Sequence, residues 1–153
     1  MRTTISKVVF WILTAAIIGA LLIAPRFAKA ECWGVATIAS RHFDGRERNE
    51  RNLGLGGECD VAKDTRLLAG FYENSSYRTS AYVGANWLPL SLGPVRFGFM
   101  GGLGTGYREG LQPIPIIAPL IALEYKGFGV NLPIIPSMFG KKGVAGLQFK
   151  GEF

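Results

Sequence analysis

The stretch from Leu67 to Trp87 constrains the fold more strongly than any other part of this 153-residue chain. It predicts two strands joined by a short polar turn, because apolar residues alternate with glycine, hydroxyl and amide residues. One face carries Leu67, Ala69, Phe71, Ala81, Val83, Ala85 and Trp87, and the other carries Leu68, Gly70, Tyr72, Asn74, Ser80, Tyr82, Gly84 and Asn86. A soluble β-domain would bury the apolar face, whereas a membrane barrel would turn it toward lipid.

Residues 1–30 have the layout of a secretory signal peptide. A basic start precedes the apolar run Val8–Ala24, and Ala28–Ala30 form an A-x-A cleavage pattern. A retained membrane helix is the alternative, since the run approaches the roughly 20 residues needed to span a bilayer. The cleavage pattern favours the signal peptide, so we expect residues 31–153 to form one exported domain.

The exported part is close to neutral in charge. The chain has 17 basic and 11 acidic residues, and four of the basic ones lie in residues 1–30, which hold no acid. The remaining 13 basic and 11 acidic residues leave a charge of about +2. No basic stripe with interleaved aromatics appears, so the sequence predicts no nucleic-acid partner.

Cys32 and Cys59 are the two cysteines of the chain. An even count in an exported protein favours a disulfide. If a hairpin pairs His42 with Asn49, the same register sets Cys32 opposite Cys59, close enough for a bridge. Two free buried thiols are the alternative. The cysteine spacing is not a metal signature and the chain has 1 histidine, so we expect no metal site.

Eight strands account for most of the exported part. We expect them near residues 32–43, 49–60, 65–74, 79–88, 94–106, 113–125, 127–136 and 143–153. Short turns are expected at Val61–Asp64, Pro89–Gly93 and Lys126–Gly127, and they alternate with longer polar connections. This arrangement is typical of an antiparallel transmembrane β-barrel with periplasmic termini, in the outer membrane of a Gram-negative bacterium.

Two strands show the two faces of this barrel most clearly. In the fifth strand the outward face is expected to carry Val95, Phe97, Phe99, Leu103 and Tyr107. The last strand ends on Phe153, which resembles the assembly signal of bacterial outer-membrane barrels. We expect Arg96, Lys150 and Glu152 to face inward and pair with one another, because a lipid-facing charge costs about 2–4 kcal/mol near the midplane.

Much of the predicted inward face is glycine, and the sequence leaves two explanations of these glycines open. The interior of an eight-stranded barrel is usually just wide enough to be filled by side chains. Small inward residues would leave a void wide enough for a hydrocarbon chain, unless bulky residues from other strands fill it. Alternatively, the glycines only relieve crowding in a tightly curved sheet.

The sixth and seventh strands are rich in proline, at Pro113, Pro115 and Pro119 and then at Pro133 and Pro136. Proline has no N–H to donate and disrupts a sheet ladder. Prolines in neighbouring strands predict local gaps in the barrel wall, through which a lipid tail would enter sideways. The alternative is that they only bound short strands.

At this point the sequence resembles the lipid A palmitoyltransferase (PagP) family. The resemblance rests on Asn49-Glu50-Arg51 with the glycine run 54–57, on Asn74-Ser75 with Gly84, and on the stretch Pro119–Phe153. It implies an eight-stranded outer-membrane barrel that moves an acyl chain from a phospholipid to lipid A. It also implies that the acyl chain lies inside the barrel and is reached through proline-flanked gaps.

The resemblance further implies a site near the outer surface, where the family acts through a histidine, an aspartate and a serine. His42 and Ser75 match two of these residues, and Asn74 stands where the family has aspartate. Glu73 and Asp44 are the two candidates to substitute for the missing carboxylate, although Glu73 points outward by alternation. No cofactor is implied.

Substrate contacts are implied at five further positions. Asn86 matches the residue that floors the acyl pocket, so the preferred chain length differs or the pocket is closed. Pro119 and Pro136 flank the lateral entrance, and Arg51 and Arg108 suit lipid A phosphates. The arginines of this rim are Arg41, Arg46, Arg48, Arg51, Arg78 and Arg108. A merely solvated basic rim is the alternative.

The sequence therefore predicts a monomeric outer-membrane acyltransferase with a phospholipid donor and lipid A as acceptor. His42 would act as general base or polarise the reacting group, and Ser75 and Asn74 would position or stabilise the oxyanion. The alternative is a non-enzymatic small barrel with a structural, surface-modifying or lipid-binding role, which Asn74 favours. A soluble periplasmic barrel that binds lipid is a third option, and the outward phenylalanines argue against it.

Overall fold

The computed structural model describes residues 30–45, 47–107, 112–136 and 143–153. The chain separates into two units, Met1–Ala30 and Glu31–Phe153. The expected signal peptide lies, except for its last residue, outside the described residues. The part of the chain that the structure describes contains no helix long and apolar enough to cross a membrane.

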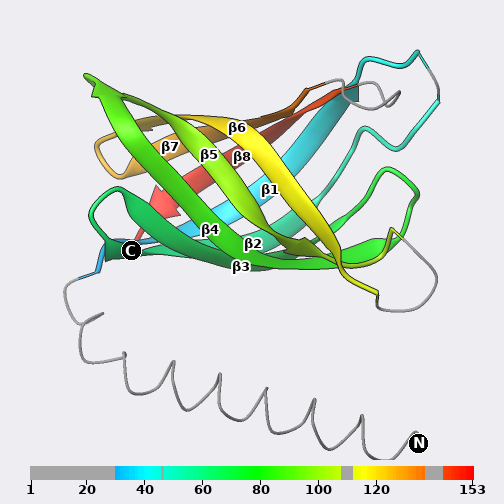
Figure 1. Cartoon of the computed structure of the whole chain (residues 1–153), viewed down its shortest axis with the longest axis horizontal. Coiled ribbons are helices and arrows are strands. Elements are labelled where there is room, and N and C mark those ends of the chain that lie inside the picture. The colour runs from blue at the N-terminus through cyan, green and yellow to red at the C-terminus, as the bar shows by residue number, and fades with distance from the viewer. Residues whose placement is uncertain (1–29, 46, 108–111, 137–142) are drawn as a thin grey trace, which may run out of the picture. The chain divides into compact units, whose positions relative to one another are not determined.

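Glu31–Phe153 folds into a closed antiparallel barrel in which each strand pairs with the next and β1 pairs with β8. The strands are β1 Cys32–His42, β2 Gly54–Ala62, β3 Thr65–Glu73, β4 Thr79–Leu92, β5 Val95–Gly104, β6 Ile114–Tyr125, β7 Phe128–Ile135 and β8 Val144–Glu152. The start of β1, the C-terminus and the short turns lie at one end of the barrel, which we call the turn end (Figure 1). The longer connections lie at the other end, the loop end (Figure 1).

The alternation of apolar residues with small and polar ones, which predicted the strands, also determines which residues lie on the outer and the inner surface of the barrel. Leu67, Phe71 and Trp87 are 51%, 54% and 52% exposed, whereas their neighbours Arg66 and Asn86 are 2% exposed. Because side chains on a strand alternate between faces, the apolar residues form the outer surface and the small and polar residues the inner one. The prediction of an all-β, eight-stranded antiparallel barrel is confirmed.

Two strand boundaries were predicted wrongly. β2 begins at Gly54 rather than Asn49, and its ladder with β1 runs from Cys32–Cys59 to Thr37–Gly54, so His42 does not pair with Asn49. The reason is that isolated backbone hydrogen bonds and the side-chain amides of Asn49 and Asn52, rather than a continuous ladder, hold residues 49–53. β4 continues through the expected turn to Leu92, because an irregularity between Trp87 and Leu90 absorbs Pro89.

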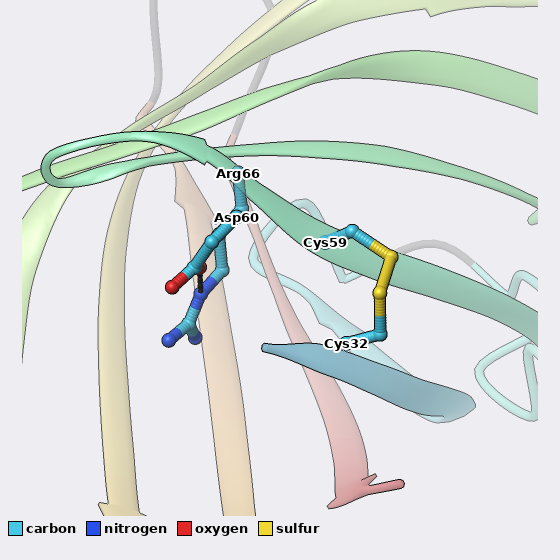
Figure 2. Close-up of a disulfide and its surroundings, with 4 residues drawn as sticks. All are labelled: Cys32, Cys59, Asp60 and Arg66. Carbon is cyan, nitrogen blue, oxygen red and sulfur yellow. Dashed lines mark hydrogen bonds and ion pairs between the residues drawn. A yellow bond between two sulfur atoms is a disulfide. The ribbon is translucent and has the colours of Figure 1, made fainter. Parts of the chain in front are cut away.

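The hairpin of β1 and β2 carries the disulfide Cys32–Cys59 at the turn end (Figure 2). The two cysteines are opposed in the ladder, and their Cα atoms lie 4.1 Å apart. Figure 2 also shows the ion pair of Asp60 with Arg66, whose Oδ1 and Nε lie 2.5 Å apart. By alternation Asp60 faces the opposite side of β2 from Cys59, so the disulfide lies on the outer surface.

Buried charges fill the interior at the turn end. Lys150 Nζ lies 2.5 Å from Glu58 Oε1 and 2.6 Å from Glu124 Oε1. Arg66 also pairs with both glutamates. The Trp33 ring completes this group, with Arg66 Cζ 5.3 Å and Lys150 Nζ 5.0 Å from its centroid. We call Trp33, Glu58, Arg66, Glu124 and Lys150 the charged plug.

The inward charges do not pair as the sequence predicted. Lys150 and Arg96 do face inward, but they do not pair with Glu152, which is exposed at the end of β8. Arg96 pairs instead with Asp64 at 3.1 Å and with Glu124 at 3.8 Å. These acids come from a turn and from β6, so the pairs form across the barrel rather than along one strand.

Some of the inward glycines make room for larger side chains. Gly56 and Gly70 are paired on β2 and β3, and a Cβ at either would collide with the Tyr82 hydroxyl, which reaches across the interior. Relief of crowding therefore explains this pair. Towards the loop end the interior is not filled, and a cavity remains there.

Candidate functional site

A cavity of about 360 Å³ occupies the loop end of the barrel interior. His42 and Ser75 both line it, His42 from the end of β1 and Ser75 from the β3–β4 loop. The structure thus brings together two of the three residues that the sequence singled out for catalysis. Inward apolar residues from four strands form one wall: Leu68, Met100, Ile114, Ile116 and Val144.

His42 presents a nitrogen that the fold leaves unpaired. Its Nδ1 atom is buried and has no hydrogen-bond partner in the described part of the chain. The charged groups that act on the imidazole are Arg48, Asp44 and Glu50. A buried imidazole nitrogen without a partner is costly, and a ligand hydroxyl in the cavity would satisfy it. His42 is therefore suited to exchange a proton with such a hydroxyl.

Asn74 takes a different place from the one its predicted role needs. Its side chain is fully buried, it is not part of the cavity lining, and its Nδ2 donates to Ser80 Oγ and to Gly106 O, both at 3.0 Å. Its Oδ1 accepts the backbone N–H groups of Ser76 at 2.8 Å and Arg78 at 3.2 Å. With both ends of the amide engaged, Asn74 has no donor left for an oxyanion, and this geometry favours a structural role.

Residues 49–52 connect the two catalytic candidates, and we call them the bridging segment. Asn49 N donates to Ser75 O at 3.2 Å, and Asn49 Nδ2 donates to Asn74 O at 3.2 Å. On the other side, Ser40 N donates to Glu50 O at 2.9 Å. The bridging segment therefore spans from β1 to the β3–β4 loop, where β2 would otherwise continue.

Polar side chains also line the cavity. Ser40 Oγ donates to Asn52 Oδ1 at 2.5 Å, and Gln148 Nε2 donates to Thr37 Oγ1 at 3.2 Å. All four residues line the cavity. Alternation placed Gln148 inside the barrel. No sequence pattern indicated that Ser40 and Asn52 would meet, because Asn52 belongs to the irregular bridging segment.

Tyr107 does not lie on the face where alternation predicted it. Alternation placed it on the outer face, but it lies beyond the end of β5, lines the cavity and shares a hydrogen bond with the Tyr72 hydroxyl. Burial raises the pKa of Tyr107 above its ordinary value, so the phenol stays protonated at neutral pH. The chain leaves strand geometry at Gly104, so the period of two no longer applies to Tyr107.

The barrel wall is open beside the cavity, between β6 and β7. Within the described residues, the β6–β7 ladder extends from Leu120–Pro133 to Tyr125–Phe128. The Glu124 N–H donates toward β5, to Pro94 O. Because N–H directions alternate along a strand, the odd-numbered residues of β6 direct their N–H groups toward β7.

This alternation explains why the ladder ends at Leu120. Continuing the same register would place Pro119 opposite Ile134 and Ile117 opposite Pro136. In each of these pairs, both backbone N–H groups would have to donate across the gap between β6 and β7. The proline of each pair has no N–H to donate. Each pair would therefore lose one of its two hydrogen bonds. Pro119 and Pro136 lie beside the unpaired part of the two strands, whereas Pro133 pairs with Leu120 at the end of the ladder.

Asn86 does not floor the cavity. It is buried, it does not line the cavity, and its Nδ2 donates to Glu58 Oε2 at 2.7 Å, so it belongs with the charged plug. Met100 instead lines the cavity and packs against the buried core of Leu88, Leu120 and Ala122. Met100 is the register partner of Asn86, so β5 rather than β4 supplies the cavity lining at this point of the ladder.

The remaining predicted substrate contacts lie at the rim or outside the description. Arg51 is exposed and does not line the cavity, and Pro119 and Pro136 are exposed along the β6–β7 seam. Arg108 lies outside the described residues. The described residues contain no group of three or more side chains suited to hold a metal ion.

Comparison with known proteins finds no matching family model and no curated protein that is significantly similar in sequence. The resemblance to the lipid A palmitoyltransferase family therefore rests on the residue patterns given above. What the geometry adds is independent of that resemblance: a closed barrel, a half-apolar cavity at one end, and an unpaired histidine nitrogen.

Proposed function

We propose that this protein is an outer-membrane acyltransferase that moves an acyl chain from a phospholipid to lipid A. The observation that carries the proposal is the cavity at the loop end, which combines an apolar wall with His42 and Ser75. An acyl chain would lie along the apolar wall, and its ester group would lie beside the two polar residues. Apolar cavities with a few placed polar groups are the usual form of small-molecule sites.

The outer surface supports a location in a membrane. Its large side chains are apolar and exposed on every side of the barrel, as at Leu55, Phe71, Trp87, Phe99, Ile117, Phe128 and Phe149. An apolar band of this kind is what a lipid bilayer requires of a barrel. Arg41 is an outward residue whose side chain is 76% exposed, so the lipid-facing part of β1 ends before it. His42 is then at the membrane surface, where lipid headgroups lie.

The open seam between β6 and β7 supports lateral entry of the acyl chain. It lies beside the cavity, because Ile114, Pro115, Ile116 and Ile117 of β6 and Ile135 of β7 line that space. A closed ladder would force a lipid tail to leave the bilayer and enter through the loops. The seam gives the tail a route in which it stays in apolar surroundings throughout.

The site residues fit a direct transfer. The hydroxyl oxygen of the acceptor attacks the ester carbonyl carbon of the donor while His42 takes the hydroxyl proton. The negative charge that develops on the carbonyl oxygen is stabilised by nearby donors, for which Ser75 and the protonated Tyr107 are placed at the cavity. The ester bond to the glycerol oxygen then breaks, and His42 returns the proton to that oxygen, leaving a lysophospholipid.

The second candidate is a non-enzymatic lipid-binding barrel. Asn74 favours it, because no carboxylate stands at this position and the amide is fully used by the loops. This candidate predicts that lipid occupies the cavity without being changed.

Mass spectrometry of lipid A separates the two candidates. The protein and its His42→Ala variant are expressed in Gram-negative cells that lack their own palmitoyltransferase. We expect an added acyl mass with the unmodified protein and none with His42→Ala, and the mass reports the chain length. An unchanged lipid A, with the folded barrel recovered from the outer membrane, would refute the transferase.

A further inference from the structure

The end of β1 lacks a strand partner on its β2 side. The β1–β2 ladder stops at Thr37–Gly54, whereas β1 continues along β8 as far as His42. Phe43 N donates to Gly143 O on the β8 side, so the His42 N–H, one residue earlier, points toward the missing part of β2. Buried or half-buried backbone N–H groups need an acceptor, and here no strand supplies one.

The Glu50 carboxylate supplies that acceptor. Its Oε1 lies 3.2 Å from His42 N, and its Oε2 lies 2.9 Å from Arg41 Nη1. The hydrogen bond from the His42 N–H, together with Arg41, holds the pKa of Glu50 below its ordinary value, so the carboxylate is charged at neutral pH. Glu50 therefore accepts hydrogen bonds from two successive residues of β1, Arg41 and His42, and brings a negative charge next to the histidine.

The other acids near His42 have different partners. Asp44 Oδ2 accepts from Arg48 Nε at 3.0 Å and from Arg48 Nη2 at 2.9 Å. Glu73 is exposed on β3 and accepts from Asn49 Nδ2 at 2.6 Å. Asp44 and Glu50 both act to raise the pKa of His42, and Glu50 accepts the hydrogen bond of the His42 backbone N–H, a contact that neither alternation nor sequence spacing predicted.

We propose that Glu50 is the positioning carboxylate of His42, the part for which the sequence indicated Glu73 or Asp44. It fixes the backbone from which the imidazole extends into the cavity, and its charge stabilises the imidazolium that forms during proton transfer. The role in transfer rests on the proposed function above. The coupling between Glu50 and His42 does not, because it is a property of the folded barrel.

The test uses the fact that the chain has 1 histidine, so the ring gives a single NMR signal. The full barrel, refolded in detergent micelles, is titrated as the unmodified protein, as Glu50→Gln and as Glu47→Gln. Glu47 is an exposed acid of the same loop and serves as the matched control. Glu50→Gln keeps an acceptor oxygen but removes the charge, so we expect the His42 titration midpoint to fall by about half a pH unit or more. Glu47→Gln should leave it unchanged.

The same variants are assayed for acyl transfer from phospholipid to lipid A in micelles across pH. We expect Glu50→Gln to lower the rate roughly tenfold and to move its pH profile with the His42 midpoint. Glu50→Asp, which keeps the charge on a shorter side chain, should recover part of both effects. Glu50→Ala also removes the charge and replaces Glu50→Gln if that variant does not fold.

An unchanged His42 signal and midpoint in folded Glu50→Gln would overturn the proposal. A shifted midpoint without any transfer by the unmodified protein would instead support the coupling and refute the proposed function. The two failures are therefore distinguishable in one set of samples.

Discussion

The two ends of the barrel interior are built from the same alternating strands but hold opposite contents. At the turn end, Glu58 and Lys150 side chains are 1% and 0% exposed and pair at 2.5 Å. At the loop end, a cavity of about 360 Å³ remains open, lined by apolar and polar side chains. Period-two patterning decides only that a residue faces inward. The size and charge of the inward residues decide whether that space is closed or left for a ligand.

The difference separates the buried ion pairs and the disulfide from the candidate site along the barrel axis. The charged plug and the disulfide lie at the turn end, and the candidate site lies at the loop end, where side-chain bonds replace strand ladders. Changes at the turn end should therefore alter stability, and changes at the loop end should alter the site.

The largest effect is expected from breaking the charged plug. Glu58→Ala leaves Lys150 and Arg66 short of a buried acid and should lower the free energy of unfolding by about 3–5 kcal/mol. Urea unfolding of the barrel in lipid vesicles measures this. The double variant Glu58→Met, Lys150→Met removes both charges and should recover most of the loss. If the double variant lowers the free energy of unfolding as much as Glu58→Ala does, the charged plug does not depend on the pairing of its charges.

Removing the disulfide should have the next largest effect. The bond joins residues 27 apart in sequence, so Cys32→Ser, Cys59→Ser should lower the free energy of unfolding by about 3 kcal/mol, because the unfolded chain gains freedom. Urea unfolding with and without the bond measures it. The His42 NMR signal should stay unchanged. A displaced His42 signal would show that the two ends are coupled after all.

At the loop end, Asn74→Asp should destabilise the protein rather than activate it. The carboxylate loses the donors to Ser80 and Gly106 and faces the Gly106 carbonyl, which should cost about 2 kcal/mol. Ser76→Asp adds the same charge at an exposed position of the same loop and is the control. Unfolding and lipid A acylation are measured together. Increased acylation by Asn74→Asp would argue that position 74 serves catalysis directly.

The smallest effect is expected at Gly106, beside Asn74. It has a φ of +83°, and an added Cβ would lie 2.6 Å from Thr79 O and 2.8 Å from Ser80 Oγ. Gly106→Ala should therefore cost about 1 kcal/mol. Gly101→Ala, where an added Cβ meets nothing within 4 Å, is the control and should be close to neutral in the same unfolding experiment. Equal costs would show that the loop adapts around position 106.

Most of the fold was predictable because strand alternation is a local property. The face assignments in β3 and β4 follow from it. The opposition of Cys32 and Cys59 was predicted from a hairpin register, which the structure keeps although the His42–Asn49 end of that hairpin does not form. The prediction failed where the backbone leaves strand geometry, at the bridging segment and at Tyr107. The candidate site was predictable in part: His42 and Ser75 meet at one cavity, but Asn74 and Asn86 do not line it.

The sequence by itself determined which residues face inward and where prolines deprive β6 and β7 of donors, because both depend on neighbouring residues along one strand. Only the tertiary structure decided that Lys150 meets Glu58 rather than Glu152, that Tyr82 fills the space over Gly56 and Gly70, and that Glu50 reaches His42. These contacts join residues from different strands and loops. Their distances depend on how all eight strands are staggered, and no single strand contains that information.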